Sequence, residues 1–122
     1  MKEDNAVLIK SHAFAKRAVL LYKMLLKNKQ PRSLADQVLR CGTSIGANVE
    51  EAVGGFSRRD FAAKCSIAYK EARETHYWLR LLRDTECLEP RLAESLMNDV
   101  EELKRILAAI IISARLPQAP QE

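Results

Sequence analysis

The sequence predicts an all-α fold, an antiparallel up-down-up-down four-helix bundle that forms one domain of 122 residues. The composition is rich in Ala, Leu, Glu, Lys and Arg, which favour helix. Apolar residues recur at helical spacing in four segments, and no segment shows the alternation of a strand. Gly and Pro, four of each, cluster at a few points, as expected of short loops. The predicted helices run at about 6–27, 34–53, 58–85 and 90–115.

The first predicted helix can be capped by Asn5 or by Asp4 before it, and Asn28 suits its C-cap. Pro31 cannot continue it, because proline lacks an N–H and clashes with the preceding turn. Its apolar stripe predicts the buried residues Val7, Phe14, Ala18, Leu21 and Leu25.

The second helix is expected to open at Ser33, with Asp36 completing a capping pattern. Its core stripe is Leu34, Val38, Cys41, Ile45, Val49 and Ala52. Gly42 and Gly46 lie four residues apart on one face, so they predict close approach of a neighbouring helix. A phosphate-binding loop is a weak alternative, since no Gly-Lys-Ser/Thr ending follows. The pair Gly54-Gly55 is expected to end the helix in a left-handed C-cap.

The third helix is the longest, with Ser57 as its cap and Asp60 in the capping pattern. Its core stripe is Phe61, Cys65, Ala68, Ala72 and Leu79. Pro90, suited to a first helical turn, opens the fourth helix. The stripe of that helix is Leu92, Leu96, Val100, Leu103, Leu107, Ile110 and Ala114.

A helical wheel of the third helix shows a second stripe, nearly opposite the first, made of Ile67, Glu74, Trp78 and Leu81. Monomers tend not to expose an apolar patch of this size, and Trp is typical of the centre of an interface. The stripe therefore favours a homo-oligomer interface at Ile67, Trp78 and Leu81. The alternative is that the first or last helix of the same chain covers it.

Basic residues are concentrated in the first three helices. Residues 1–83 hold 16 Lys and Arg against 8 Asp and Glu, whereas residues 84–122 hold 4 against 8. Because arginine pairs with phosphate and tyrosine stacks on bases, two stripes are candidate contacts for RNA or DNA. They comprise Lys16, Arg17, Lys23 and Lys27 on the first helix, and Arg59, Arg73, Arg80, Tyr69 and Tyr77 on the third. The alternative is a solvated face, with Arg73 paired to neighbouring glutamates.

Catalytic and metal-binding chemistry finds no support in the spacing of polar residues. Glu50 and Glu51 point about 100° apart, and His12 and His76 have no ligand partner at helical spacing. The sequence therefore predicts a protein that is not an enzyme and that needs no metal or cofactor. It also predicts no membrane span and a cytoplasmic location, with reduced cysteines.

Helices two and three together resemble a known family, the four-helix bundle proteins encoded in intervening sequences of bacterial 23S ribosomal RNA genes. The resemblance rests on Ser44, Ile45, Asn48 and Glu51, and then on Phe61, Ala72, Glu74, Trp78 and Leu79. It implies an up-down-up-down bundle and often a ring-shaped homopentamer. A related branch serves diversity-generating retroelements, where a basic pentamer binds reverse transcriptase and nucleic acid. Asn48, Glu51 and Glu74 carry over as structural polar positions.

Two functions remain open at this point. The first is an oligomeric scaffold or accessory factor that binds nucleic acid, with RNA favoured over DNA. The second is a protein-interaction module without a nucleic-acid role, in which the basic faces meet an acidic protein.

Overall fold

The computed structural model describes residues 2–116, and its side chains from residue 5 onward. The four helices are α1 (Lys2–Lys27), α2 (Arg32–Val53), α3 (Arg58–Asp84) and α4 (Pro90–Arg115), and the described range contains no strand. None of these helices combines the length and apolarity needed to cross a membrane. The predicted all-α class and its four helices are confirmed.

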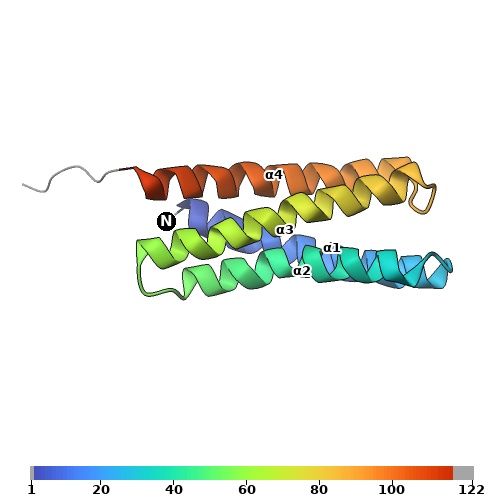
Figure 1. The fold of residues 1–122 in the computed structure, drawn as a ribbon, viewed down its shortest axis with the longest axis horizontal. Coiled ribbons are helices and arrows are strands. Elements are labelled where there is room, and N and C mark those ends of the chain that lie inside the picture. Colours follow the sequence, from blue (N-terminus) through green and yellow to red (C-terminus); the bar gives the residue numbers. More distant parts are fainter. Residues whose placement is uncertain (1, 117–122) are drawn as a thin grey trace, which may run out of the picture.

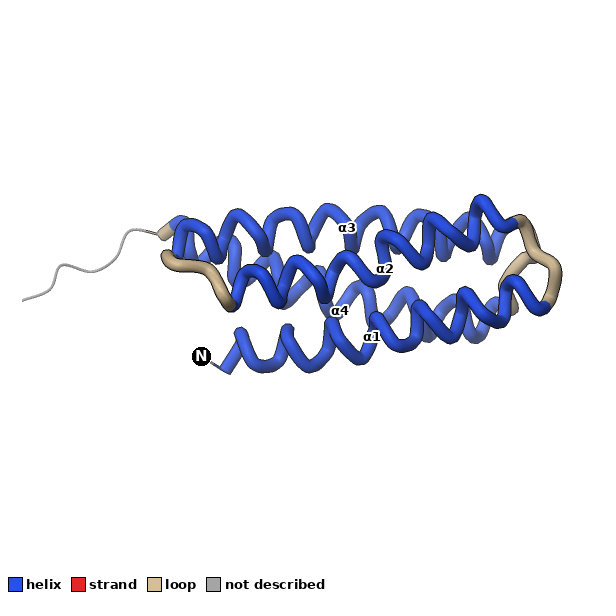
Figure 2. Tube along the Cα trace, turned by 90° about the horizontal axis from the view of Figure 1, so that it is seen from below, coloured by secondary structure: helices blue, strands red, loops and turns tan. Residues whose placement is uncertain are grey.

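The helices lie side by side along one long axis (Figures 1 and 2). Each helix packs against the next one in the chain, and α1 also contacts α4. The α1–α4 contact is the least extensive of the four, and the backbones of α1 and α3 do not pack directly against each other. The start of α1, the α2–α3 turn and the end of α4 lie at one end of the molecule (Figure 1).

The core is made of the apolar stripes that the sequence predicts. Every predicted core residue of α1 and α3 is at most 6% exposed. On α2 and α4 the predicted stripes are buried as well, except that Leu34, Leu92 and Ala114 are half-buried. Ala35, Leu82, Leu88 and Met97 join the same cluster. The helical spacing of apolar residues therefore identifies most of the core directly.

The two glycines inside α2 bring α1 and α2 into close contact. A Cβ placed on Gly42 would lie 3.0 Å from the Ala18 Cβ, and one on Gly46 would lie 3.2 Å from the Ser11 backbone oxygen. The missing side chains therefore let α1 approach the α2 backbone, which offsets the low helix propensity of glycine. The predicted close helix–helix approach is confirmed.

Two of the predicted helix ends are formed as expected. The Ser57 hydroxyl accepts a hydrogen bond from the Asp60 backbone N–H at 3.1 Å, which caps α3. Pro90 opens α4, where the Glu89 carboxylate accepts hydrogen bonds from the N–H groups of Arg91 and Leu92. At both sites a side chain satisfies backbone donors that the first helical turn leaves without partners.

Other helix ends differ from the prediction. Helix α2 begins at Arg32, with Pro31 at the N-cap and no side-chain cap, so Ser33 lies inside the first turn. Gly54 adopts φ −82°, in the right-handed region, so the left-handed cap predicted there is wrong. Among residues 2–116, those in the left-handed region are Lys29 (φ 60°) and Glu86 (φ 62°), just beyond α1 and α3. At position 55 glycine is favoured because there is little room for a side chain. A Cβ there would lie 3.2 Å from the Ala52 carbonyl oxygen.

The second stripe of α3 is not the freely exposed surface that the helical wheel predicts. Trp78 is half-buried and packs against the core of its own chain, and Leu81 is half-buried too. The reason is that this flank of α3 faces α2, since Glu71 and Glu74 both bind Arg40 of α2 and Trp78 follows one turn later. Of the three predicted interface residues, Ile67 is the exposed one, at 41%.

Candidate nucleic-acid interface

A basic groove of about 470 Å³ runs between α3 and α4. It is lined by Lys70, Arg73, Glu74, His76, Tyr77, Arg80 and Lys104. Lys104 is contributed by α4 and the others by α3. The fold thus brings together three of the predicted nucleic-acid contacts, Arg73, Tyr77 and Arg80.

The α3 side of the groove follows from helical geometry. Lys70, Arg73, Tyr77 and Arg80 are separated by three, four and three residues. This spacing places them on one helical face, over a length of about 15 Å at 1.5 Å per residue. Lys70 could have been found from this spacing, whereas Lys104 could not, because only tertiary packing brings α4 alongside.

The groove has more positive than negative charge available to a ligand. Its one carboxylate, Glu74, is hydrogen-bonded to Arg40 of α2. Lys70 and Arg73 form no ion pair or hydrogen bond with another described residue, so the pairing of Arg73 with glutamates is absent in this part of the chain. Lys104 differs, because its Nζ lies 3.1 Å from Glu101 Oε1. Lys70, Arg73 and Arg80 therefore line the groove without an ion-pair partner among the described residues.

An aromatic side chain lies among these cations. Tyr77 is 46% exposed, and its ring packs edge-on to Trp78, with the ring centres 5.1 Å apart and the planes at 73°. The Arg80 guanidinium lies over the Tyr77 ring, 5.8 Å from its centre. A cation and an aromatic surface are thus presented together, as proteins that bind single strands require.

His76 lines the groove in a half-buried position, with Nε2 3.5 Å from Glu101 Oε1. Burial lowers the pKa of His76 below its ordinary value of 6.5, and the positive charges of Lys104, Arg80 and Arg83 lower it further. The Glu101 carboxylate opposes this shift of the pKa. Near neutral pH the imidazole is therefore uncharged, and it adds no fixed positive charge to the groove.

We expect His76 to make the folded state less stable in mild acid. Its pKa is lower in the folded chain than in the unfolded chain, so below about pH 6.5 the unfolded state binds more protons. The free energy of unfolding should therefore fall as the pH drops from neutrality through the lowered pKa. His76→Gln should flatten this pH dependence, because it removes the group whose pKa differs between the folded and unfolded chains. Urea unfolding at several pH values measures the effect, and equal slopes for wild type and His76→Gln would contradict it.

The other predicted contacts do not line this groove. Arg59 is exposed near the start of α3, and Tyr69 is half-buried in a separate hollow beside Ile111 and Ile112. The α1 residues Lys16, Lys23 and Lys27 are exposed and have no partner among the described residues. None of them lines the groove, and the backbones of α1 and α3 do not pack directly against each other, so they form a second basic surface away from the groove.

Arg17 has a different role from its predicted neighbours on α1. Its Nη1 lies 2.6 Å from Asp99 Oδ2, and its Nη2 donates a hydrogen bond to the Ser95 hydroxyl at 3.1 Å. Both partners belong to α4. Arg17 therefore links α1 to α4 and is not a free cation available to a ligand.

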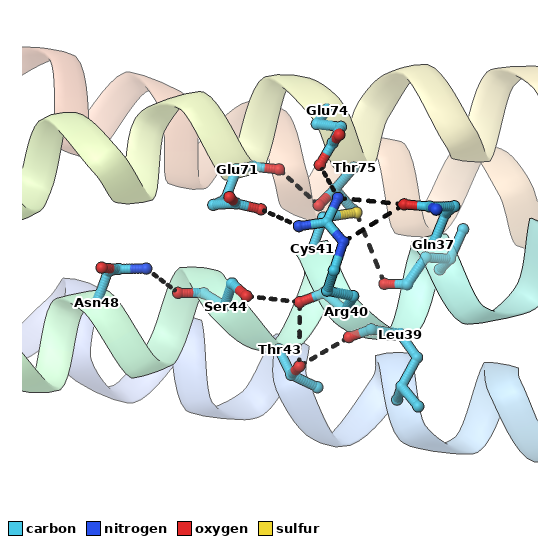
Figure 3. Close-up of polar contacts among 11 residues, drawn as sticks. Gln37, Leu39, Arg40, Cys41, Thr43, Ser44, Asn48, Glu71, Glu74 and Thr75 are labelled. Atoms are coloured by element: carbon cyan, nitrogen blue, oxygen red, sulfur yellow. Dashed lines mark hydrogen bonds and ion pairs between the residues drawn. The ribbon is translucent and has the colours of Figure 1, made fainter.

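A polar cluster joins α2 to α3, and Glu74 belongs both to it and to the groove (Figure 3). The Arg40 guanidinium binds Glu74, lies 3.4 Å from Glu71 Oε2, and donates to the Gln37 side-chain oxygen. Two further polar positions are also satisfied. Asn48 Nδ2 donates to the Ser44 carbonyl at 2.8 Å, and Glu51 pairs with Lys64 of α3 at 2.8 Å. The Arg40–Glu74 and Glu51–Lys64 pairs link α2 to α3, whereas the Asn48 bond lies within α2. All three contacts agree with the structural role that the resemblance implies for Asn48, Glu51 and Glu74.

Cys41, which lies beside this cluster, is an unreactive thiol (Figure 3). Burial raises the pKa of Cys41 to about 11, and its thiol points to the Val38 carbonyl oxygen at 3.8 Å. The thiol therefore remains protonated at neutral pH, whereas only the thiolate form of a cysteine acts as a nucleophile. Within the described residues, no group of three or more His, Cys, Asp or Glu side chains could hold a metal ion.

The fold and groove define a class: an all-α protein with four helices and a cation-rich surface on its third. Within that class, residues 3–109 match the family model described as 23S rRNA-intervening sequence protein. The chain belongs to this family, so the resemblance seen in the sequence is confirmed.

A solved structure supports the same assignment. It is a crystal structure of a protein with unknown function from the S23 ribosomal protein family of Bacteroides thetaiotaomicron VPI-5482. The two proteins are 48% identical and superpose with a TM-score of 0.87, over 90% of this chain and 98% of that one. No curated protein matches the chain.

Proposed function

We propose that this protein is a non-enzymatic scaffold or accessory factor that binds RNA, with its antiparallel up-down-up-down bundle presenting the α3–α4 groove. The observation that carries the proposal is the set of unpaired cations around an exposed aromatic ring. Lys70, Arg73 and Arg80 line the groove together with Tyr77, and Glu74, the carboxylate among the lining residues, is hydrogen-bonded to Arg40.

The chemistry of phosphate explains why such a groove suits nucleic acid. Arginine and lysine side chains on a surface remain hydrated when they lack a partner, so a phosphate can bind them without first displacing a carboxylate. The binding affinity increases with the number of phosphates bound, because each phosphate contact releases condensed counterions. The separate α1 surface of Lys16, Lys23 and Lys27 offers a second place for the backbone of a longer RNA.

The test is fluorescence anisotropy of a labelled structured RNA with nuclease-treated protein, titrated with salt. We expect micromolar or tighter binding at low salt, and a steep linear fall of log K against log salt. The slope counts the phosphates that the protein neutralises. Absence of binding at low salt would contradict the proposal and favour a protein-interaction module, whose sign is a partner protein that stays bound through nuclease treatment.

We also propose that the chain forms a homo-oligomer, which the family resemblance suggests is a pentamer. The support is exposed apolar surface on two faces. Ile67 on α3 is 41% exposed, whereas on α1 Ile9 is 71% and Leu20 is 64% exposed. Burying such residues between copies removes about 25 cal/mol of unfavourable hydration per Å² of apolar area.

We expect Leu20→Asp or Ile67→Asp to reduce the assembly, because a charge at the centre of a packed interface loses its water. Trp78→Asp is less informative, since the half-buried Trp78 packs against the core of its own chain. Multi-angle light scattering gives the mass of each variant, and circular dichroism checks that the helices are intact. Whichever variant lowers the mass identifies the face, and unchanged masses for both would exclude these two faces.

A further inference from the structure

Tyr77 is held in one orientation although nearly half of its surface is exposed. Its ring packs edge-on to Trp78, and Trp78 is packed against the core. The Tyr77 hydroxyl makes no hydrogen bond to another described residue. A ring fixed in this way loses little conformational entropy when a flat ligand stacks on it, and its hydroxyl remains free for a polar group.

Arg80 covers this ring only loosely. The distance of 5.8 Å between the guanidinium carbon and the ring centre lies at the outer limit of a cation–π contact. Such a contact is weak at an exposed site, so the guanidinium can move aside or stack on a ligand itself. Lys70 and Arg73 lie on the same face of α3 as Tyr77, within phosphate reach of a base placed there.

We propose that the groove selects single-stranded over double-stranded nucleic acid by stacking one unpaired base on Tyr77, with Lys70, Arg73 and Arg80 binding the adjacent phosphates. This proposal rests on the proposed function and names the kind of nucleic acid. Bases inside a duplex are stacked on each other, so a tyrosine ring in a surface groove cannot reach their faces. An unpaired base offers its face to any aromatic ring, whatever the sequence.

The experiment compares three probes with the full-length protein: a short unstructured RNA, an abasic oligomer of equal length and charge, and the duplex form of the same RNA. Trp78 is the sole tryptophan, and it lies 5.1 Å from the Tyr77 ring, so its emission reports on this site. We expect the unstructured RNA to bind about tenfold more tightly than the abasic oligomer, which is the affinity that one stacked base contributes. The unstructured RNA should also change the Trp78 emission.

Two variants separate stacking from general structure. Tyr77→Phe keeps the aromatic ring, so it should retain the preference for the base-bearing RNA. Tyr77→Leu keeps an apolar side chain but removes the aromatic ring, so it should bind both oligomers equally. If the wild type binds the abasic oligomer or the duplex as tightly as the unstructured RNA, the stacking proposal fails while phosphate binding stands. If none of the probes binds at low salt, the proposed function fails as well.

Discussion

Replacing Lys70, Arg73 and Arg80 together by Gln should weaken RNA binding about 100-fold at low salt. The estimate takes roughly 1 kcal/mol for each lost phosphate contact, and 1.4 kcal/mol for each factor of ten. The dependence of log K on log salt should become shallower by about 2, because each single-strand phosphate contributes about 0.7. Lys70 is included because it lines the groove, and Arg59 is left unchanged because it does not. The anisotropy titration described above provides both quantities.

The control for this variant removes the same charge elsewhere. Arg32, Arg91 and Arg115 are exposed and none of them lines the groove. Changing these three to Gln lowers the net charge equally, so a general electrostatic attraction would weaken by a similar amount. An equal loss of RNA affinity in the two triple variants would show that binding depends on the overall charge of the protein and not on the groove.

Gly46→Leu should destabilise the fold by about 3 kcal/mol, at the upper end of what overpacking a core costs. Even a Cβ at this position would lie 3.2 Å from the Ser11 carbonyl oxygen, which is backbone and cannot rotate away. The larger side chain must push α1 off α2. Urea unfolding followed by circular dichroism gives the free energy of unfolding.

The neighbouring residue provides a matched comparison. Ala47 is exposed on α2, so Ala47→Leu introduces the same side chain toward solvent and should change stability by less than about 0.5 kcal/mol. Equal stability of Gly46→Leu and Ala47→Leu would mean that α1 does not approach α2 as closely as the structure shows.

Much of the fold could be predicted from the sequence, because helical periodicity depends on local residues. The stripes of α1 and α3 are buried throughout, and Ser57 caps α3 through a pattern spanning four residues. The Ser33 pattern is equally good, yet Pro31 already sets the chain direction and its carbonyl oxygen accepts the first helical bonds. A capping pattern alone cannot decide between two adjacent starting points.

The groove was only partly predictable, for two physical reasons. The spacing of Arg73, Tyr77 and Arg80 is visible in the sequence, but Lys104 joins them through packing of α4 on α3. A helical wheel also assumes one buried face, whereas α3 packs between α2 and α4 and buries two flanks. That is why Trp78, on the second stripe, lies against its own core and not on an open surface.

The order in which the helices touch has a consequence for how the chain assembles. Three of the four helix contacts join neighbours in sequence, which makes them quick to form, since short loops are closed at little entropic cost. Only the α1–α4 contact joins the two ends of the chain, and it is the least extensive. The pairs Arg17–Asp99 and Lys10–Glu102 bridge this seam at the surface, where salt screens them. We therefore expect the α1–α4 contact to close last during folding and to open first by local unfolding, most readily at high ionic strength.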